Sequence, residues 1–529
     1  MSEEVLRTRY LEELHRYRDI DLIKVITGMR RVGKSVLLRQ FRSALEAEGI
    51  PKENIIYIDM DSFGNYRYKD GTITYEEIKD RADQGRLYIL IDEVQKITDW
   101  MLMVESLRND IDCDIYITGS NAYMLSSDIA TLLTGRSITI TVLPLSLKEV
   151  CDLYDEPDPR MLFLKYLRHG GLPIIRPELS EEVSFQLINE LKSDIILKDI
   201  CSRRPGTDPI KIRNVIDYLY SEVGNPISVT RMSEALGISS STASEYLQLI
   251  TDSMLFTKVE RYDLKGRMIL KQEPKYYCSD TGMRYSQPMS KDRDFGKTLE
   301  TMVYHELVRR GHRVYIGRPP SGNKMDDRHL EIDFIVMKDG STDYYQVTDS
   351  LHNPTVHDRE FRPLRKISGR GERYVITYDD VPVSKGPDAI VMNIVDFLMM
   401  DEPEEVPERT ESNMYGMLND MLLGYVDICS RISDTIVTRE NFDGLSGELQ
   451  ENFFNLQAFF RRPDLIEDMF LQDQLSRIRK SNVRIFNAMV GCVNANKEPL
   501  YRPVMRPELE EIRVISDMIQ QYTDEKMGV

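Results

Sequence analysis

Residues 22–35, LIKVITGMRRVGKS, carry the clearest fold signal in the first part of this chain. Its apolar, β-branched start (Leu22 to Thr27) predicts a buried strand, and Gly28–Ser35 fits the phosphate-binding pattern G-x-x-x-x-G-K-[ST]. Such a loop turns its backbone N–H groups inward to form an anion-binding nest, and the helix that follows points its positive end at the same place. The stretch therefore predicts a strand, a nucleotide-binding loop and a helix in succession.

Several positions of the predicted loop have defined roles in binding ATP and Mg²⁺. Lys34 is expected to reach the β- and γ-phosphates as a point charge, and Ser35 is expected to ligate Mg²⁺ through its hydroxyl. The residues expected to contact the nucleotide are Gly28, Met29, Arg30, Arg31, Val32, Gly33, Lys34 and Ser35. The alternative is a chance match in a surface turn, which would need neither the strand before the loop nor the helix after it.

Length and composition describe a folded protein with several domains. The 529 residues exceed what one hydrophobic core supports and suggest three or four domains. With 41% hydrophobic and 29% charged residues the chain is neither disordered nor fibrous, and its net charge of −18 disfavours indiscriminate coating of nucleic acid. The six scattered cysteines predict reduced thiols. Because the N-terminus has no apolar signal segment and no run approaches ~18 apolar residues, a cytoplasmic location is expected.

Two further apolar runs follow along the chain, and the second of them ends in a pair of acidic residues. Residues 54–61 predict a second buried strand, and the apolar run within 85–97 ends in Asp92-Glu93, which is the Walker B arrangement. Asp92 at the strand tip is expected to hold Mg²⁺, directly or through water. Glu93 is expected to accept a proton from, or to orient, the water that attacks the γ-phosphate. The alternative is that both residues only cap a following helix.

Two further sites complete the expected catalytic set. Residues 113–125 predict a fourth strand with Ser120 and Asn121 at its tip. In ATPases with an inserted strand between the Walker strands, a polar residue at this tip touches the γ-phosphate, and the sequence does not choose between the two. Arg136 precedes a fifth strand and is expected either to read a phosphate, in cis or across an oligomer interface, or to be a plain surface arginine.

These motifs together resemble a known family. GMRRVGKS, LYILIDEVQ, ITGSNA, LLTGR and VLPLSLKE, in this order, resemble the prokaryotic AAA-type ATP-binding proteins that carry a winged helix and a C-terminal nuclease-like domain. The resemblance covers roughly residues 10–395. It implies a parallel sheet with the strand order of additional-strand ATPases, and ATP rather than GTP as the nucleotide.

The expected fold is α/β with an all-α C-terminal extension. A P-loop AAA-type core with a parallel sheet is followed by a helical lid, a winged helix, a restriction-endonuclease-like α/β domain, an acidic linker and a helical domain. Their expected bounds are 1–145, 146–205, 206–290, 291–400, 401–412 and 413–529. In the last of these, Phe453, Phe454, Phe459 and Phe460 are expected to be bundle core rather than a binding box.

The winged-helix expectation rests on spacing. Ser228 or Thr230 caps a short helix, Gly237 makes the turn, and a second helix follows that buries Ala243, Tyr246, Leu247 and Ile250. The second helix presents no Lys or Arg to a DNA groove, so the hairpin at 256–277 is the better candidate for phosphate contacts. Its basic residues are Lys258, Arg261, Lys265, Arg267 and Lys271. A winged helix that packs on the lid or on a partner protein is equally expected.

The nuclease-like region lacks part of its expected metal site. Glu300 on a helix and Asp333 on a strand match two carboxylates of the E…D…(E/D)-x-K motif, but the third position reads Gln346-Val347-Thr348. An amide replaces a carboxylate and the lysine is missing, with His352 and Lys338 as the only local substitutes. We therefore expect at most loose Mg²⁺ binding here and no metal-dependent cleavage.

The functional expectation is an ATP-binding and ATP-hydrolysing protein. Its nucleotide state would control a winged-helix and nuclease-like module that binds DNA or a protein partner. A non-hydrolysing ATP switch is the alternative, and an ATP-dependent nuclease is the third reading.

Overall fold

The computed structural model describes most of the chain as two compact units. The first comprises residues 1–379 and 388–404, and the second 380–387 and 405–529. Within them the described residues are 4–82, 85–119, 136–176, 178–204, 206–264, 268–287, 295–319, 330–338, 341–367, 371–400, 411–434, 469–495, 502–527 and short pieces between 445 and 456. The expected linker at 401–412 lies almost entirely outside these residues.

The described N-terminal residues form a five-stranded parallel sheet in the order β2-β3-β4-β1-β5. The strands are β1 (Ile23–Thr27), β2 (Ile55–Asp59), β3 (Leu87–Asp92), β4 (Cys113–Thr118) and β5 (Ser137–Thr141). The phosphate-loop strand β1 and the Asp92 strand β3 are separated by β4. This is the additional-strand order that the resemblance implies, and the α/β fold class is confirmed.

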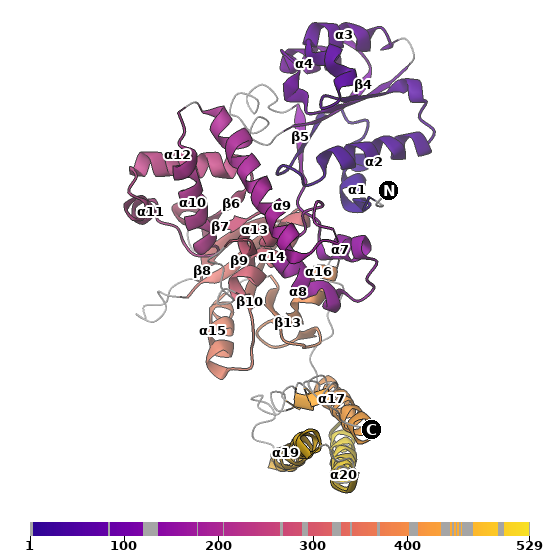
Figure 1. The fold of residues 1–529 in the computed structure, drawn as a ribbon, viewed down its shortest axis with the longest axis vertical. Helices are drawn as coiled ribbons and strands as arrows, with labels where there is room; N and C mark the ends of the chain where they lie inside the picture. The colour runs from indigo at the N-terminus through magenta and orange to yellow at the C-terminus, as the bar shows by residue number, and fades with distance from the viewer. Residues whose placement is uncertain are drawn as a thin grey trace. The chain divides into compact units, whose positions relative to one another are not determined.

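Helices cover both faces of this sheet (Figure 1). They are α1 (Thr8–Arg16), α2 (Lys34–Ala47), α3 (Gly71–Lys79) and α4 (Trp100–Asp110). The aliphatic side chains of β1, β2, β3 and β4 on one face pack against α3 and α4, where Trp100 is 4% exposed. Continuous apolar runs are required because a parallel sheet is buried on both sides.

A group of helices follows the sheet in the first unit, as expected for residues 146–200. They are α7 (Leu147–Tyr154), α8 (Pro159–His169), α9 (Glu181–Asp194), the π-helix η5 (Ile195–Ile200) and α10 (Pro209–Ser221). The Gly170-Gly171 break between α8 and α9 is tied by hydrogen bonds to other parts of the unit. Gly171 N–H donates to Asp280 Oδ2 at 2.8 Å, and its carbonyl accepts from Leu145 N–H at 2.7 Å.

The helix-turn-helix signals are confirmed. Helices α11 (Val229–Leu236) and α12 (Ser240–Asp252) are joined at Gly237, which adopts φ 63°. The Ser228 side chain caps α11, which decides between the two expected caps. The four residues expected in the core of the second helix are all buried, namely Ala243, Tyr246, Leu247 and Ile250.

The hairpin after the helix-turn-helix does not stand free as a wing. Strands β6 (Phe256–Asp263) and β7 (Met268–Cys278) are antiparallel, as expected, but β6 also pairs in parallel with β8 (Arg313–Arg318). Arg261 on β6 is consequently only 6% exposed and pairs with Glu331 at 3.1 Å. The expectation that Arg261 contacts DNA phosphates is therefore wrong. Lys265 and Arg267 lie outside the described residues, and the side chain of Lys271 is not described.

The hairpin is continuous with a mixed sheet in which the strands of the first unit run β13-β11-β10-β9-β8-β6-β7. Its other strands are β9 (Ile332–Lys338), β10 (Ser341–Thr348), β11 (Arg373–Thr377) and β13 (Ile390–Asn393). Its helices are α13 (Thr281–Tyr285), α14 (Phe295–Arg309), α15 (Pro354–Arg365) and α16 (Ile394–Met399). The expected helix and strands of the nuclease-like region are present.

The second unit is helical. It contains α17 (Glu411–Asp434), α19 (Met469–Ala495) and α20 (Arg502–Met527), besides the short strand β12 (Ser384–Lys385). Their buried aliphatic side chains form one cluster that includes Phe453, so the core assignment of this residue is confirmed. Tyr425 donates to Asn482 Oδ1 at 2.8 Å between α17 and α19. The other three phenylalanines singled out in the sequence lie outside the described residues.

Two absences hold for the described part of the chain. None of its helices is long and apolar enough to cross a membrane. Its cysteines with described side chains are free thiols, at positions Cys113, Cys151, Cys201, Cys278 and Cys429.

Candidate nucleotide-binding site

The loop between β1 and α2 has the backbone geometry of an anion nest. Gly28 adopts φ 149° and Gly33 adopts φ 101°, both in the region that favours glycine. A Cβ at Gly28 would lie 2.4 Å from the Val142 carbonyl oxygen, so no other residue fits there. Arg31 also has a positive φ of 66°. The loop is therefore tightly turned at the carboxyl edge of β1, where successive N–H groups converge.

Lys34 begins α2 behind this loop. Its ammonium donates to the carbonyl oxygens of Gly28 at 2.8 Å and Met29 at 3.2 Å, and the residue is 7% exposed. Burial lowers the pKa of Lys34, while the nearby carboxylates of Glu93 and Asp92 act in the opposite direction. The helix has Gly33 as its N-cap and no side-chain cap, so the positive end of α2 faces the loop.

Asp92 and Glu93 lie at the carboxyl end of β3, on the same edge of the sheet. Asp92 is 2% exposed and accepts a hydrogen bond from the hydroxyl of Thr118 at the tip of β4. The same hydroxyl accepts from Glu93 N–H at 3.0 Å. Glu93 has φ 57°, makes no side-chain cap, and its Oε2 accepts from Gln95 Nε2. The alternative that Glu93 caps the helix is thus not observed.

The ligand types at this edge suit Mg²⁺. Ser35 offers a hydroxyl and Asp92 a carboxylate, and Mg²⁺ prefers hard oxygen ligands supplied by one or two protein groups together with phosphates and water. Among the described residues no group of three or more His, Cys, Asp or Glu side chains forms a metal site.

Three residues that sequence reasoning missed hold this site together. Arg7 is 2% exposed and donates to Val32 O at 3.0 Å and to Glu149 Oε1 at 2.8 Å, so it braces the loop from behind. Thr118 bridges β4 to the acids of β3. Asp199 forms an ion pair with Arg30 of the loop at 2.7 Å. Of these three residues, only Thr118 could have been found from the sequence, because it ends the strand in the ITGS motif. Arg7 and Asp199 are distant in sequence from every motif.

The remaining predicted site residues have different outcomes. Ser120 and Asn121 lie outside the described residues. Arg136 comes directly before β5, whose Ser137 pairs with Ile23 at the amino end of β1. It therefore lies at the edge of the sheet opposite the phosphate loop, about 16 Å away at ~3.3 Å per residue. The expectation that Arg136 reads a phosphate in cis is wrong; it is 49% exposed and pairs with Glu105.

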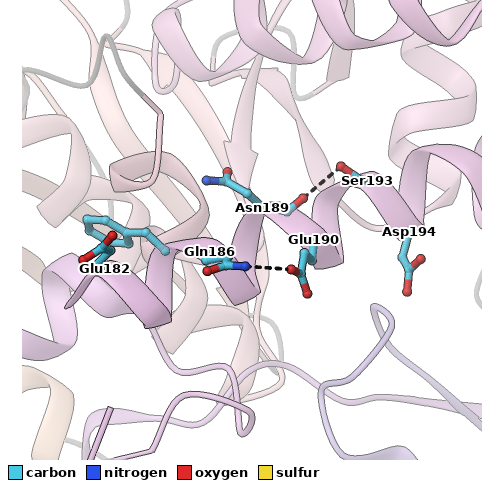
Figure 2. Close-up of a pocket in the computed structure, with 7 residues that line it drawn as sticks. Glu182, Gln186, Asn189, Glu190, Ser193 and Asp194 are labelled. Carbon is cyan, nitrogen blue, oxygen red and sulfur yellow. Dashed lines mark hydrogen bonds between the residues drawn. The ribbon is translucent and has the colours of Figure 1, made fainter. Parts of the chain in front are cut away.

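A hollow lies along one face of α9 and has a volume of about 810 Å³. Figure 2 shows its lining side chains, which are polar except for Phe185. Gln186 donates to Glu190 Oε1 at 3.2 Å, and Asp194 stands at the end nearest the π-helix. The hydrogen bond from Lys198 lowers the pKa of Asp194, and Arg30 and Arg31 of the phosphate loop add to the effect.

A second cluster of charged side chains is buried in the mixed sheet. In this Lys275 cluster, the Lys275 ammonium lies 3.0 Å from Glu300 Oε1, 3.2 Å from Glu331 Oε2 and 3.8 Å from Asp333 Oδ1. Lys297 pairs with the other oxygen of Glu300 at 2.7 Å. The expectation that His352 and Lys338 are the only local substitutes for the missing lysine is therefore wrong. Lys275 comes from β7, which sequence reasoning assigned to the wing, and the sheet brings it to Glu300.

Hydrogen bonds of Gln346 connect this cluster to neighbouring residues. Gln346 accepts from Asp333 N–H at 2.9 Å and donates to Glu360 Oε2 at 2.9 Å. Lys275 is fully buried, and the carboxylates raise its pKa although burial acts the other way. The Lys275 and Lys297 ammonium groups hold the pKa of Glu300 down at about 2. An ammonium thus contacts the carboxylates that would ligate a metal.

Comparison with known proteins agrees with the first site. Residues 21–151 match a family model described as an AAA domain, and residues 160–293 match a domain of unknown function. A protein of Haemophilus influenzae, described as uncharacterized, is 35% identical over 406 residues, which is 75% of this chain and 98% of that protein. This chain belongs to that protein family. An uncharacterized protein of Methanocaldococcus jannaschii is 28% identical over 382 residues, 66% of this chain and 80% of its own length.

The solved structures that resemble this chain are less similar to it than these two relatives are. An ORC1 protein of Aeropyrum pernix, solved in complex with DNA, has a TM-score of 0.26 and 11% identity, and the match covers 54% of this chain and 92% of that one. DnaA of Aquifex aeolicus, bound to AMPPCP, has a TM-score of 0.26 and 13% identity, with 47% and 89% covered. These scores are too low to support an inference about function.

Proposed function

We propose that this chain binds ATP with Mg²⁺ at the phosphate loop and hydrolyses it. The observation that carries the proposal is the meeting of three chemically different groups at one edge of a parallel sheet. These groups are the buried Lys34 ammonium, the Ser35 hydroxyl and the Asp92-Glu93 acid pair. The match of residues 21–151 to an AAA domain supports it independently.

Each residue has a separate task in this proposal. Lys34 supplies a positive charge to the β- and γ-phosphates, while Ser35 and Asp92 hold the metal ion. Bound Mg²⁺ would neutralise charge that develops on the phosphate oxygens. Glu93 orients the attacking water and accepts its proton. Ser120 or Asn121 touches the γ-phosphate, and Arg136 acts across an interface between copies of the chain.

The nucleotide state would control the winged-helix and mixed-sheet region, which would bind DNA or a protein partner. Helices α9, η5 and α10 connect the two regions within the first unit, and this supports such control. For DNA, the basic residues left to make phosphate contacts are Lys258, which is 40% exposed and paired with Glu260 at 3.1 Å, and Lys265, Arg267 and Lys271.

A non-hydrolysing switch is the second candidate, favoured by one contact. Gln95 Nε2 donates to Glu93 Oε2, so the carboxylate that should orient water is already occupied. If this bond persists with ATP bound, the site binds nucleotide without turning it over.

Two measurements test the proposal. In calorimetry with ATP and Mg²⁺, Lys34→Ala should weaken ATP binding by ~100-fold or more, because it removes the cation that faces the phosphates. The exposed Lys52→Ala on the same sheet domain is the matched control. Equal binding by Lys34→Ala and wild type would refute the site.

Hydrolysis is tested separately by phosphate release. Glu93→Gln should bind ATP but release little phosphate, because an amide cannot accept the proton of the water. Equal release by wild type and Glu93→Gln, with and without DNA, would favour the switch.

A further inference from the structure

A bidentate ion pair joins the phosphate loop to the helical segment that leads to the winged helix. Arg30 Nε and Nη2 donate to Asp199 Oδ2 and Oδ1 at 2.9 and 2.7 Å. The Asp199 side chain is 7% exposed, whereas that of Arg30 is 34% exposed. A guanidinium fork that fits a carboxylate in this way fits a phosphate equally well. Arg30 therefore has one partner now and the geometry to take another.

Asp199 sits on an unusual element. The π-helix η5 (Ile195–Ile200) continues α9 directly, and its isoleucines Ile195, Ile196 and Ile200 are buried. Short π-helical segments interrupt the regular hydrogen bonding of an α-helix, and they occur often at functional sites. η5 packs on α10, which in turn packs on α11 and α12 of the helix-turn-helix. A change at Asp199 is thus connected to the winged helix through packed helices.

Asp199 also belongs to the electrostatic surroundings of the phosphate site. The carboxylates of Glu93, Asp92 and Asp199 all act to raise the pKa of Lys34, against the effect of its burial. A triphosphate held by Lys34 brings further negative charge to these carboxylates. Like charges at short range repel strongly where solvent is excluded, so Asp199 is the group best placed to be displaced.

We propose that Asp199 is a nucleotide-sensing latch that competes with the γ-phosphate of ATP for Arg30. Without ATP the pair holds η5 against the phosphate loop. With ATP, Arg30 turns to the phosphate, the pair opens, and η5 is released together with its packing on α10. This inference rests on the proposed ATP binding and adds how binding is transmitted. Coupling is reciprocal, so breaking the latch must strengthen ATP binding.

The first experiment measures this reciprocity. In the Glu93→Gln background, calorimetry with Mg²⁺ compares Asp199→Asn with the parent for ATP and for ADP. We expect ATP to bind about tenfold tighter to Asp199→Asn, which corresponds to ~1.4 kcal/mol, and ADP to bind less than threefold tighter. ADP responds less because it has no γ-phosphate to compete for Arg30.

Asp194→Asn is the matched control. It removes the same charge from the preceding turn, where Asp194 forms its ion pair with Lys198 at 2.9 Å and interacts with Arg30 only at longer range. We expect its ATP affinity to change by less than threefold. A tenfold gain in both variants would assign the effect to net charge and overturn the latch.

The second experiment uses wild-type protein and does not depend on a variant that folds. Amide hydrogen exchange of residues 195–200 should speed up with ATP and Mg²⁺ and remain unchanged with ADP. The latch would be overturned if exchange slowed or stayed the same with ATP. It would also be overturned if Asp199→Asn bound ATP no more tightly than its parent. Either result would leave the proposed ATP binding intact. Absence of ATP binding by wild type would overturn the proposed function and the latch together.

Discussion

Lys34 and Lys275 are both buried lysines with carboxylates nearby, one behind the phosphate loop and the other in the mixed sheet. The Lys34 ammonium donates hydrogen bonds to the carbonyl oxygens of Gly28 and Met29, and burial lowers its pKa. The Lys275 ammonium pairs directly with Glu300 and two further carboxylates, which raise its pKa.

The difference separates a site that needs a ligand from one that is already filled. Around Lys34 the desolvation of a charge outweighs the attraction of more distant acids, so an arriving anion is favoured. Around Lys275 the attraction of close carboxylates outweighs desolvation, and the ammonium groups of Lys275 and Lys297 already lie against the carboxylate oxygens that a cation would contact. Similar residue types therefore indicate ligand binding in one region and structural stabilisation in the other.

The largest expected effect follows from removing Lys275. Lys275→Ala leaves the Glu300 carboxylate buried beside acids and should lower the free energy of unfolding by ~3–5 kcal/mol. Lys34→Ala should cost much less, because it breaks only contacts with carbonyl oxygens. Urea denaturation of both variants measures this. Equal losses would erase the distinction between the two lysines.

A pH effect on stability is expected from Asp333 in the mixed sheet. Burial, together with the Glu300 carboxylate, raises the pKa of Asp333 to about 7. Because the folded state holds this proton more tightly, the resulting stability is full below pH ~4 and is lost as the pH rises through about 7. Asp333→Asn mimics the protonated form, so its melting temperature should gain on wild type between pH 4 and pH 8. Parallel curves would contradict the assignment.

A smaller effect concerns DNA at the hairpin. If DNA binds there, changing Lys265 and Arg267 to Ala should reduce the salt slope of binding by roughly 0.9 per contact. Arg261→Ala is the control, because this buried arginine pairs with Glu331 and should leave the slope unchanged. Full affinity and slope in the double variant would favour a protein partner instead.

The smallest expected effect is none at all. Incubation with linear, circular and single-stranded DNA, ATP and Mg²⁺ or Mn²⁺ should give no cleavage, since Lys275 contacts the carboxylates that would hold the metal. Cleavage that disappears in Asp333→Ala would show that the cluster is active and would restore the ATP-dependent nuclease reading.

Local patterns in the sequence were enough to predict the local features. The strand, loop and helix at 22–35, the acid pair after β3 and the helix-turn-helix follow from short-range periodicity and from glycines that only certain backbone angles admit. The additional-strand order came from the family resemblance, and the structure confirmed it.

Which distant charges meet could be seen only once the chain was folded. Pairing of β6 with β8 buried Arg261 and carried Lys275 of β7 to Glu300, although the hairpin pattern suggested a free wing. Parallel pairing of β5 with β1 placed Arg136 at the edge away from the phosphates. The Arg30–Asp199 pair spans a separation of 169 residues. Such contacts depend on strand order and helix packing, and no local pattern encodes them because the partners share neither a motif nor a period.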